Sequence, residues 1–157
     1  MNIIGIDYGH KRIGLAYADS GIGVAVPIPA AAEAAPQARL AHIAAEVQAR
    51  KIDKIVLGYP LNMDGTKSQK AEEVDAFARV LADTFGLPIA RVDERLSSYQ
   101  AEAEIAAFAP KKVKSIAARK KTRRTGEVDS RAAALFLQEY LDTGGEIEPI
   151  DAAPQPL

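Results

Sequence analysis

Three acidic side chains stand where they could do chemistry together. Asp7 follows a short apolar run at residues 3–6. Glu94 follows a second run at residues 88–92, and Asp129 opens a helical pattern. Carboxylates are the hard oxygen ligands that Mg²⁺ and Mn²⁺ prefer, and two such ions about 4 Å apart can drive phosphodiester hydrolysis. The three acids therefore indicate a metal site, in which they are both the ligands and the catalytic residues.

Each acid also has a purely structural explanation. Asp7 could cap the turn that follows it, and Glu94 could form a surface ion pair with Arg91 or Arg95. Asp129 lies in a first helical turn, where a negative charge meets the helix dipole favourably. A buried carboxylate is costly unless a positive group meets it. One metal site would account for all three acids, whereas the structural explanations are separate.

Basic residues accompany the acids. Lys11 and Arg12 follow Asp7 in the next turn, where Lys11 could offset phosphate charge or orient the attacking water. A basic segment without acids holds eight of the 20 basic residues in fourteen positions: Lys111, Lys112, Lys114, Arg119, Lys120, Lys121, Arg123 and Arg124. Together with Arg12, this segment is predicted to bind nucleic acid through phosphate contacts.

The elements that must position these residues follow from apolar periodicity. Short apolar runs predict strands, and stripes at i, i+3, i+4 and i+7 predict amphipathic helices. The predicted strands cover residues 2–7, 13–18, 24–28, 54–58 and 88–92, with Pro29 ending the third. One predicted helix begins at Pro36 and carries its apolar stripe over residues 40–47. The other predicted helices cover residues 71–85, 97–110 and 128–141.

This order predicts an α/β fold. A hairpin meander followed by helix crossovers gives a mixed five-stranded sheet with helices on both faces. Right-handed crossovers place the later strands beside the first. Because sites in open α/β sheets gather at strand ends, Asp7 and Glu94 are expected at one edge.

Composition narrows the class of protein. The 157 residues suit one domain, predicted at residues 1–142 with a flexible tail at 143–157. No apolar run could span a membrane and no signal peptide is apparent, so a cytoplasmic protein is expected. With no cysteine, the chain has neither disulfides nor thiolate metal ligands, so the metal must be held by oxygen. The net charge of −1 conceals the basic segment.

Four blocks of sequence carry a family resemblance. Residues 7–16, 58–66, 92–97 and 128–133 read DYGHKRIGLA, GYPLNMDGT, VDERLS and VDSRAA. In this order they resemble the signature blocks of the bacterial YqgF/RuvX family, over about residues 2–142. Four blocks in order are far more specific than any one of them.

The resemblance implies an RNase H-like fold related to RuvC resolvases, with the family acids at Asp7, Glu94 and Asp129. RuvC-type sites usually have a fourth acid near the last one. The corresponding turn here is residues 130–133, which hold no acid, so the number of metal ions stays open. Family members are described as Holliday junction resolvases and as nucleases in 5′-end maturation of 16S ribosomal RNA precursors.

The main hypothesis is therefore an Mg²⁺- or Mn²⁺-dependent endonuclease acting on ribosomal RNA precursor, as a monomer or weak homodimer. Cleavage of branched DNA is one alternative, and a non-catalytic RNA-binding assembly factor is another. An actin-like ATPase or sugar kinase also opens with an Asp-x-Gly hairpin. This chain is too short for the usual two such domains and has no adenosine-binding glycine-rich segment.

Overall fold

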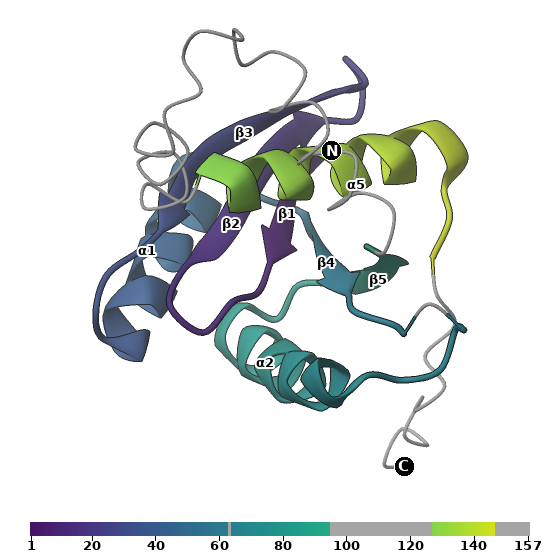
Figure 1. Ribbon diagram of the computed structural model, residues 1–157. Coiled ribbons are helices and arrows are strands. Elements are labelled where there is room, and N and C mark those ends of the chain that lie inside the picture. Colours follow the sequence, from purple (N-terminus) through teal and green to yellow (C-terminus); the bar gives the residue numbers. More distant parts are fainter. Residues whose placement is uncertain (63, 95–126, 147–157) are drawn as a thin grey trace, which may run out of the picture.

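A five-stranded mixed sheet forms the centre of the molecule (Figure 1). The computed structural model describes residues 1–62, 64–94 and 127–146, and for residues 127–129 it describes the backbone alone. The order across the sheet is β3-β2-β1-β4-β5, so β1 is the central strand. The strands are β1 (Asn2–Asp7), β2 (Ile13–Asp19), β3 (Val24–Ala31), β4 (Lys54–Tyr59) and β5 (Ile89–Asp93).

The sheet combines two kinds of strand pairing. β2 pairs antiparallel with β1 and β3, whereas β4 pairs parallel with β1 and β5. β1, β4 and β5 therefore run in the same direction, and their carboxyl ends meet at one edge. The predicted mixed five-stranded sheet is confirmed.

Helices cover both faces of the sheet, which accounts for the unbroken apolar runs of the inner strands. α1 (Pro36–Ala49) and α2 (Gln69–Phe85) lie on one face, and α5 (Glu127–Thr143) lies on the other (Figure 1). Successive residues of a strand point to opposite faces. Ile4 accordingly packs in the core beneath α1 and α2, while Ile3 packs in the core beneath α5.

A glycine in β1 lets α5 come close to the sheet. A Cβ atom at Gly5 would lie 3.2 Å from Leu137 Cβ and 3.3 Å from the carbonyl oxygen of Ala133. A side chain there would force the helix outward by a few tenths of an ångström. Gly5 therefore sets the height of α5 above the central strand.

The predicted boundaries agree with the structure to within two residues, with one exception. The third strand was expected to end at Pro29, but β3 continues to Ala31. Proline cannot donate to a strand ladder, yet β3 is an edge strand with only β2 beside it. Pro27 and Pro29 are tolerated because an edge strand pairs on one side only.

Several predicted segments lie outside the described residues. These are the helix at residues 97–110, the basic segment and the tail beyond residue 146. Their structure stays a prediction. Within the part of the chain that is described, no helix is long and apolar enough to cross a membrane.

Candidate active site

Two of the three predicted acids lie at the same edge of the sheet. Asp7 is the last residue of β1, and Glu94 directly follows β5. β4 runs between them, and one more step in its pairing with β1 brings Gly58 level with Asp7. The Glu94 amide donates to the Tyr59 carbonyl at 3.4 Å, which continues the pairing of β5 with β4. The expected convergence of Asp7 and Glu94 on this edge is thereby supported.

Both acids also belong to the face of the sheet that α5 covers. Strand alternation places Asp7 on the same side as Ile3 and Gly5, which meet α5. Glu94 follows Val92 by two residues, and Val92 is part of the same core. Two carboxylates thus share one face and one edge, with a single strand between them.

The Glu94 carboxylate occupies a recess that Gly58 leaves open. A Cβ atom at Gly58 would lie 2.5 Å from Glu94 Oε2 and 2.7 Å from Phe136 Cε2. Glu94 as a residue is only 9% exposed there. Neither Gly58 nor Phe136 was among the predicted site residues. The available signal was the glycine itself, since a glycine inside a strand often marks a close approach.

Asp129 is placed by its backbone alone. It lies in the first turn of α5, one turn before Ala133, whose carbonyl oxygen lies close to Gly5 of β1. The next residue, Ser130, accepts from the amide of Leu15, which pairs with Ile6 near the end of β1. The amino end of α5 therefore lies toward the end of the sheet where β1 finishes. Among the described side chains, no group of three acids or histidines could hold a metal. The three-carboxylate site thus stays a prediction.

The residues present fit a divalent ion in their chemistry. Asp7, Glu94 and Asp129 would supply oxygen ligands, as Mg²⁺ and Mn²⁺ require. The recess over Gly58 holds the Glu94 carboxylate away from water, where a nearby cation stabilises it most. The donor set and the recess are both suited to such an ion.

The predicted cations of the hairpin turn lie at the same edge as the acids. The turn between β1 and β2 needs a glycine, because a Cβ at Gly9 would lie 2.5 Å from the Arg12 carbonyl oxygen. Lys11 is exposed in this turn and Arg12 is half-buried. The turn is held against α2 by a contact of 2.9 Å between His10 Nε2 and Glu73 Oε2. The basic segment lies outside the described residues.

A buried polar network lies at the same end of β4, on the α2 side. Asp75 of α2 is 8% exposed and accepts a hydrogen bond of 3.0 Å from the Tyr59 hydroxyl. Lys67 Nζ lies 2.8 Å from Asp75 Oδ2, and Arg91 Nη2 lies 3.3 Å from Oδ1. Burial is the main reason that the pKa of the Tyr59 phenol is raised, and the hydrogen bond to Asp75 raises it further. The network joins β4, β5, α2 and the loop after β4.

Sequence reasoning missed Asp75, although a signal was present. Asp75 lies within the apolar stripe of α2, between the buried residues Ala71, Val74 and Ala78. An acid on a buried stripe needs partners. Its partners Lys67 and Arg91 come from separate elements, so the pairing was not visible in the sequence.

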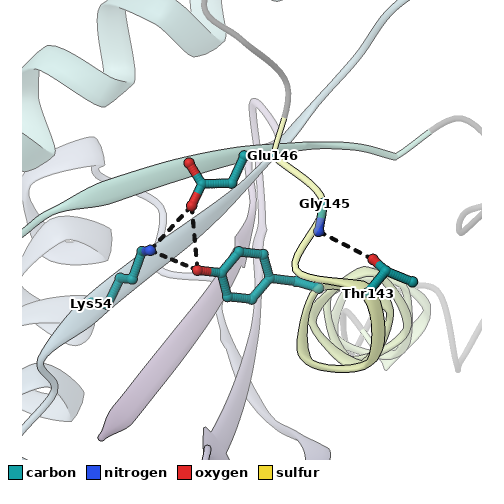
Figure 2. A network of polar contacts seen from close by, with 5 residues as sticks. Lys54, Thr143, Gly145 and Glu146 are labelled. Carbon is teal, nitrogen blue, oxygen red and sulfur yellow. Dashed lines mark hydrogen bonds and ion pairs between the residues drawn. The ribbon is translucent and has the colours of Figure 1, made fainter.

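A second polar network holds the carboxyl end of α5, the end opposite Asp129, against β4 (Figure 2). Lys54 Nζ, at the start of β4, donates to the Tyr140 hydroxyl at 2.6 Å and lies 3.2 Å from Glu146 Oε1. The hydrogen bond to Tyr140 is the main reason that the pKa of Lys54 is raised. This network lies at the amino end of β4, away from Asp7 and Glu94, so its role is to anchor the helix.

Comparisons with known proteins identify a family and a shared fold. The family described as "RuvX: Holliday junction resolvase" matches residues 1–143. A relative from Opitutus terrae named "Putative pre-16S rRNA nuclease" is 46% identical, covering 90% of this chain and 92% of its own. A relative of the same name from Picosynechococcus is 40% identical, covering 89% and 91%.

The fold is shared with a solved structure of a resolvase. The Fowlpox virus resolvase, solved with Holliday junction DNA, covers 90% of this chain and 99% of its own at 14% identity. The TM-score is 0.53. At this identity the likeness concerns the fold alone. The mixed sheet between helices is the RNase H-like fold that the sequence blocks imply.

Proposed function

Because the chain belongs to the RuvX family, we propose that it is a divalent-metal-dependent endonuclease that cleaves a 16S ribosomal RNA precursor near its mature 5′ end. The observation that carries the proposal is the placement of Asp7 and Glu94 on one face and one edge of the sheet, either side of Gly58. The names of the relatives support RNA as the substrate. The description of the family supports branched DNA as the alternative.

In this mechanism the protein supplies ligands and a fixed geometry. Asp7, Glu94 and Asp129 would hold the metal, which when bound polarises a phosphoryl oxygen and stabilises the leaving oxygen. Rigid strands hold Asp7 and Glu94, and the recess over Gly58 restricts where the Glu94 carboxylate can go. Such preorganisation avoids reorganisation at the moment of reaction.

Substrate binding would rest on charge. A cluster of carboxylates repels a phosphodiester, so cations at its rim are needed, and Lys11 is exposed at this edge. The basic segment would hold the backbone farther along. Phosphate contacts are largely indifferent to base sequence, which suits a site that recognises RNA by position and shape. A cytoplasmic protein acting as a monomer or weak homodimer fits this role.

The deciding experiment compares two substrates. The purified protein is incubated with a 16S precursor and with a four-way DNA junction, in Mg²⁺, in Mn²⁺ and with chelator. We expect metal-dependent cleavage of the precursor near its mature 5′ end. Cleavage of the junction alone would select the branched-DNA alternative, and cleavage that persists in chelator would exclude the metal mechanism.

The matched variant is Asp7→Asn, which removes a charge and nearly preserves shape. We expect it to unfold at the same temperature within a few degrees and to lose cleavage. Wild-type turnover in Asp7→Asn would overturn the proposed site. Full complementation in cells by Asp7→Asn, with RNA binding intact, would instead favour the non-catalytic assembly factor.

A further inference from the structure

Ser130 is a buried hydroxyl at the amino end of α5. It is 4% exposed and contacts two different strands. Its Oγ accepts a hydrogen bond from the Leu15 amide of β2 at 3.3 Å and donates to the Ile28 carbonyl of β3 at 2.9 Å. The register of β2 against β3 shifts between Ile13 and Leu15. Ser130 thus binds the two strands at the irregular step of their ladder.

The hydrogen bond between Ser130 and Leu15 joins two residues that are close in the chain to the proposed site. Asp129 precedes Ser130 in the first turn of α5. Leu15 follows Gly14, and Gly14 is the residue of β2 that pairs with Asp7. One path from Asp7 to Asp129 therefore runs through the backbone at Leu15 and its hydrogen bond to Ser130.

The first turn of a helix is where such an anchor is most needed. Its amide groups have no partners within the helix, and helix ends fray. A ligand carried on that turn must be held to within about 0.5 Å to bind a metal well. The Ser130 hydroxyl hydrogen-bonds the backbone of β2 and the backbone of β3, so it holds the first turn of α5 against these two strands.

We propose that Ser130 is a positioning residue, whose hydroxyl fixes the first turn of α5 so that Asp129 is held at the end of β1 beside Asp7. The inference rests on the proposed function, because it takes Asp129 as a metal ligand. Removing the hydroxyl loosens the turn while leaving every carboxylate in the chain. The purely structural reading is that Ser130 only satisfies the irregular step of the ladder and adds stability.

The same helix offers a matched control. Gln138 also joins α5 to the start of β3: its Oε1 accepts from the Ala25 amide at 2.9 Å, and its Nε2 donates at 2.9 Å to the carbonyl of Gly23, which directly precedes the strand. Gln138 lies about two turns farther along the helix than Ser130. Gln138→Ala therefore removes two bonds between α5 and the start of β3 without touching the turn that carries Asp129.

The experiment compares Ser130→Ala, Ser130→Thr and Gln138→Ala with the wild type. Amide exchange over residues 127–131 reports on the first turn independently of any activity, and Mn²⁺ titration by electron paramagnetic resonance reports on the site. We expect Ser130→Ala to speed exchange there and to weaken Mn²⁺ binding and turnover about 10- to 100-fold. Gln138→Ala is expected to lower the unfolding temperature similarly while leaving Mn²⁺ binding unchanged. Ser130→Thr, which keeps the hydroxyl, is expected to recover Mn²⁺ binding.

The outcomes separate the two proposals. Equal Mn²⁺ binding by Ser130→Ala and Gln138→Ala would overturn the positioning role. A wild-type protein that binds no Mn²⁺ would overturn the proposed function instead, and the exchange measurement would still report on the anchor. If Ser130→Ala does not fold, Ser130→Cys fills the site with a slightly larger thiol that is a weaker donor, and it gives the same comparison.

Discussion

The Glu94 carboxylate lies in the space that a side chain at Gly58 would fill, since a Cβ there would come within 2.5 Å of Glu94 Oε2. Phe136 closes the same space from α5, at 2.7 Å from that position. The acid is therefore held between a strand and an aromatic ring. The absence of one methyl group from β4 makes room for a candidate metal ligand.

Adding that methyl group tests the recess. In Gly58→Ala, Glu94 and Phe136 must both move. Overpacking of this kind costs about 1–3 kcal/mol of unfolding free energy. We expect the displaced carboxylate to lower turnover at least about tenfold, as is typical when a ligand loses its support. Urea unfolding and single-turnover cleavage measure the two effects.

A second substitution separates stability from positioning. Phe136→Leu in the Gly58→Ala background gives back space on the helix side only. This double variant is expected to recover much of the lost stability and to remain slow, because the Glu94 recess is still filled. If turnover recovers together with stability, the glycine serves packing and not the acid.

The Tyr59–Asp75 pair predicts how stability changes at alkaline pH. Because the pKa of Tyr59 is raised, the folded state favours the protonated phenol. The resulting contribution to the free energy of unfolding is present below the ordinary pKa of about 10, and it is lost as the pH rises through the folded pKa. Tyr59→Phe removes the hydrogen bond of 3.0 Å to Asp75 and is expected to cost about 1 kcal/mol near pH 7. Above about pH 10 the difference from wild type should shrink. Urea unfolding at both pH values checks this, and a constant difference would contradict it.

Local signals were sufficient for the hairpin and for the placement of two acids. The run before Asp7, the turn glycine at position 9 and the run before Glu94 each act within a few residues. The parallel pairing of β1, β4 and β5 then follows from the helices that precede β4 and β5 in the chain. Asp7 and Glu94 consequently reach one edge, as predicted.

Contacts between distant residues were not predictable in the same way. The recess at Gly58 depends on Phe136, and the partners of Asp75 come from a loop and from β5. The end of β3 was misplaced because proline reads as a strand breaker, whereas at a sheet edge its missing N–H costs nothing. Each of these features depends on tertiary position and not on local pattern.

The basic segment is predicted to bind the RNA backbone with an affinity that depends on salt. Replacing Lys120, Lys121, Arg123 and Arg124 with Gln should weaken RNA binding and flatten its salt dependence. Each lost phosphate contact reduces the slope of log affinity against log salt by about 0.7–0.9. Stability should hardly change, because lysine and arginine are almost never fully buried and surface substitutions change it within about 0.5 kcal/mol. An unchanged slope between about 50 and 200 mM salt would exclude this segment as the backbone contact.

Lys11 provides the sharpest test of charge at the proposed site. It lies exposed in the turn that follows Asp7, at the edge where both acids lie. A carboxylate cluster repels a phosphodiester, and the repulsion grows as negative charge develops in the transition state. A cation at the rim therefore stabilises the transition state more than the bound substrate, and such an interaction acts on rate.

Lys11→Ala should thus lower single-turnover cleavage about ten- to a thousand-fold at saturating metal, with a smaller change in substrate affinity. Arg79→Ala is the matched control, because it removes one exposed positive charge from α2. It should leave both quantities near their wild-type values, since exposed charges act weakly at a distance in salt. An equal loss of affinity and rate in Lys11→Ala would assign Lys11 to substrate binding alone. A wild-type rate would make Lys11 an ordinary surface lysine, because a turn residue without a partner in the transition state cannot change the barrier.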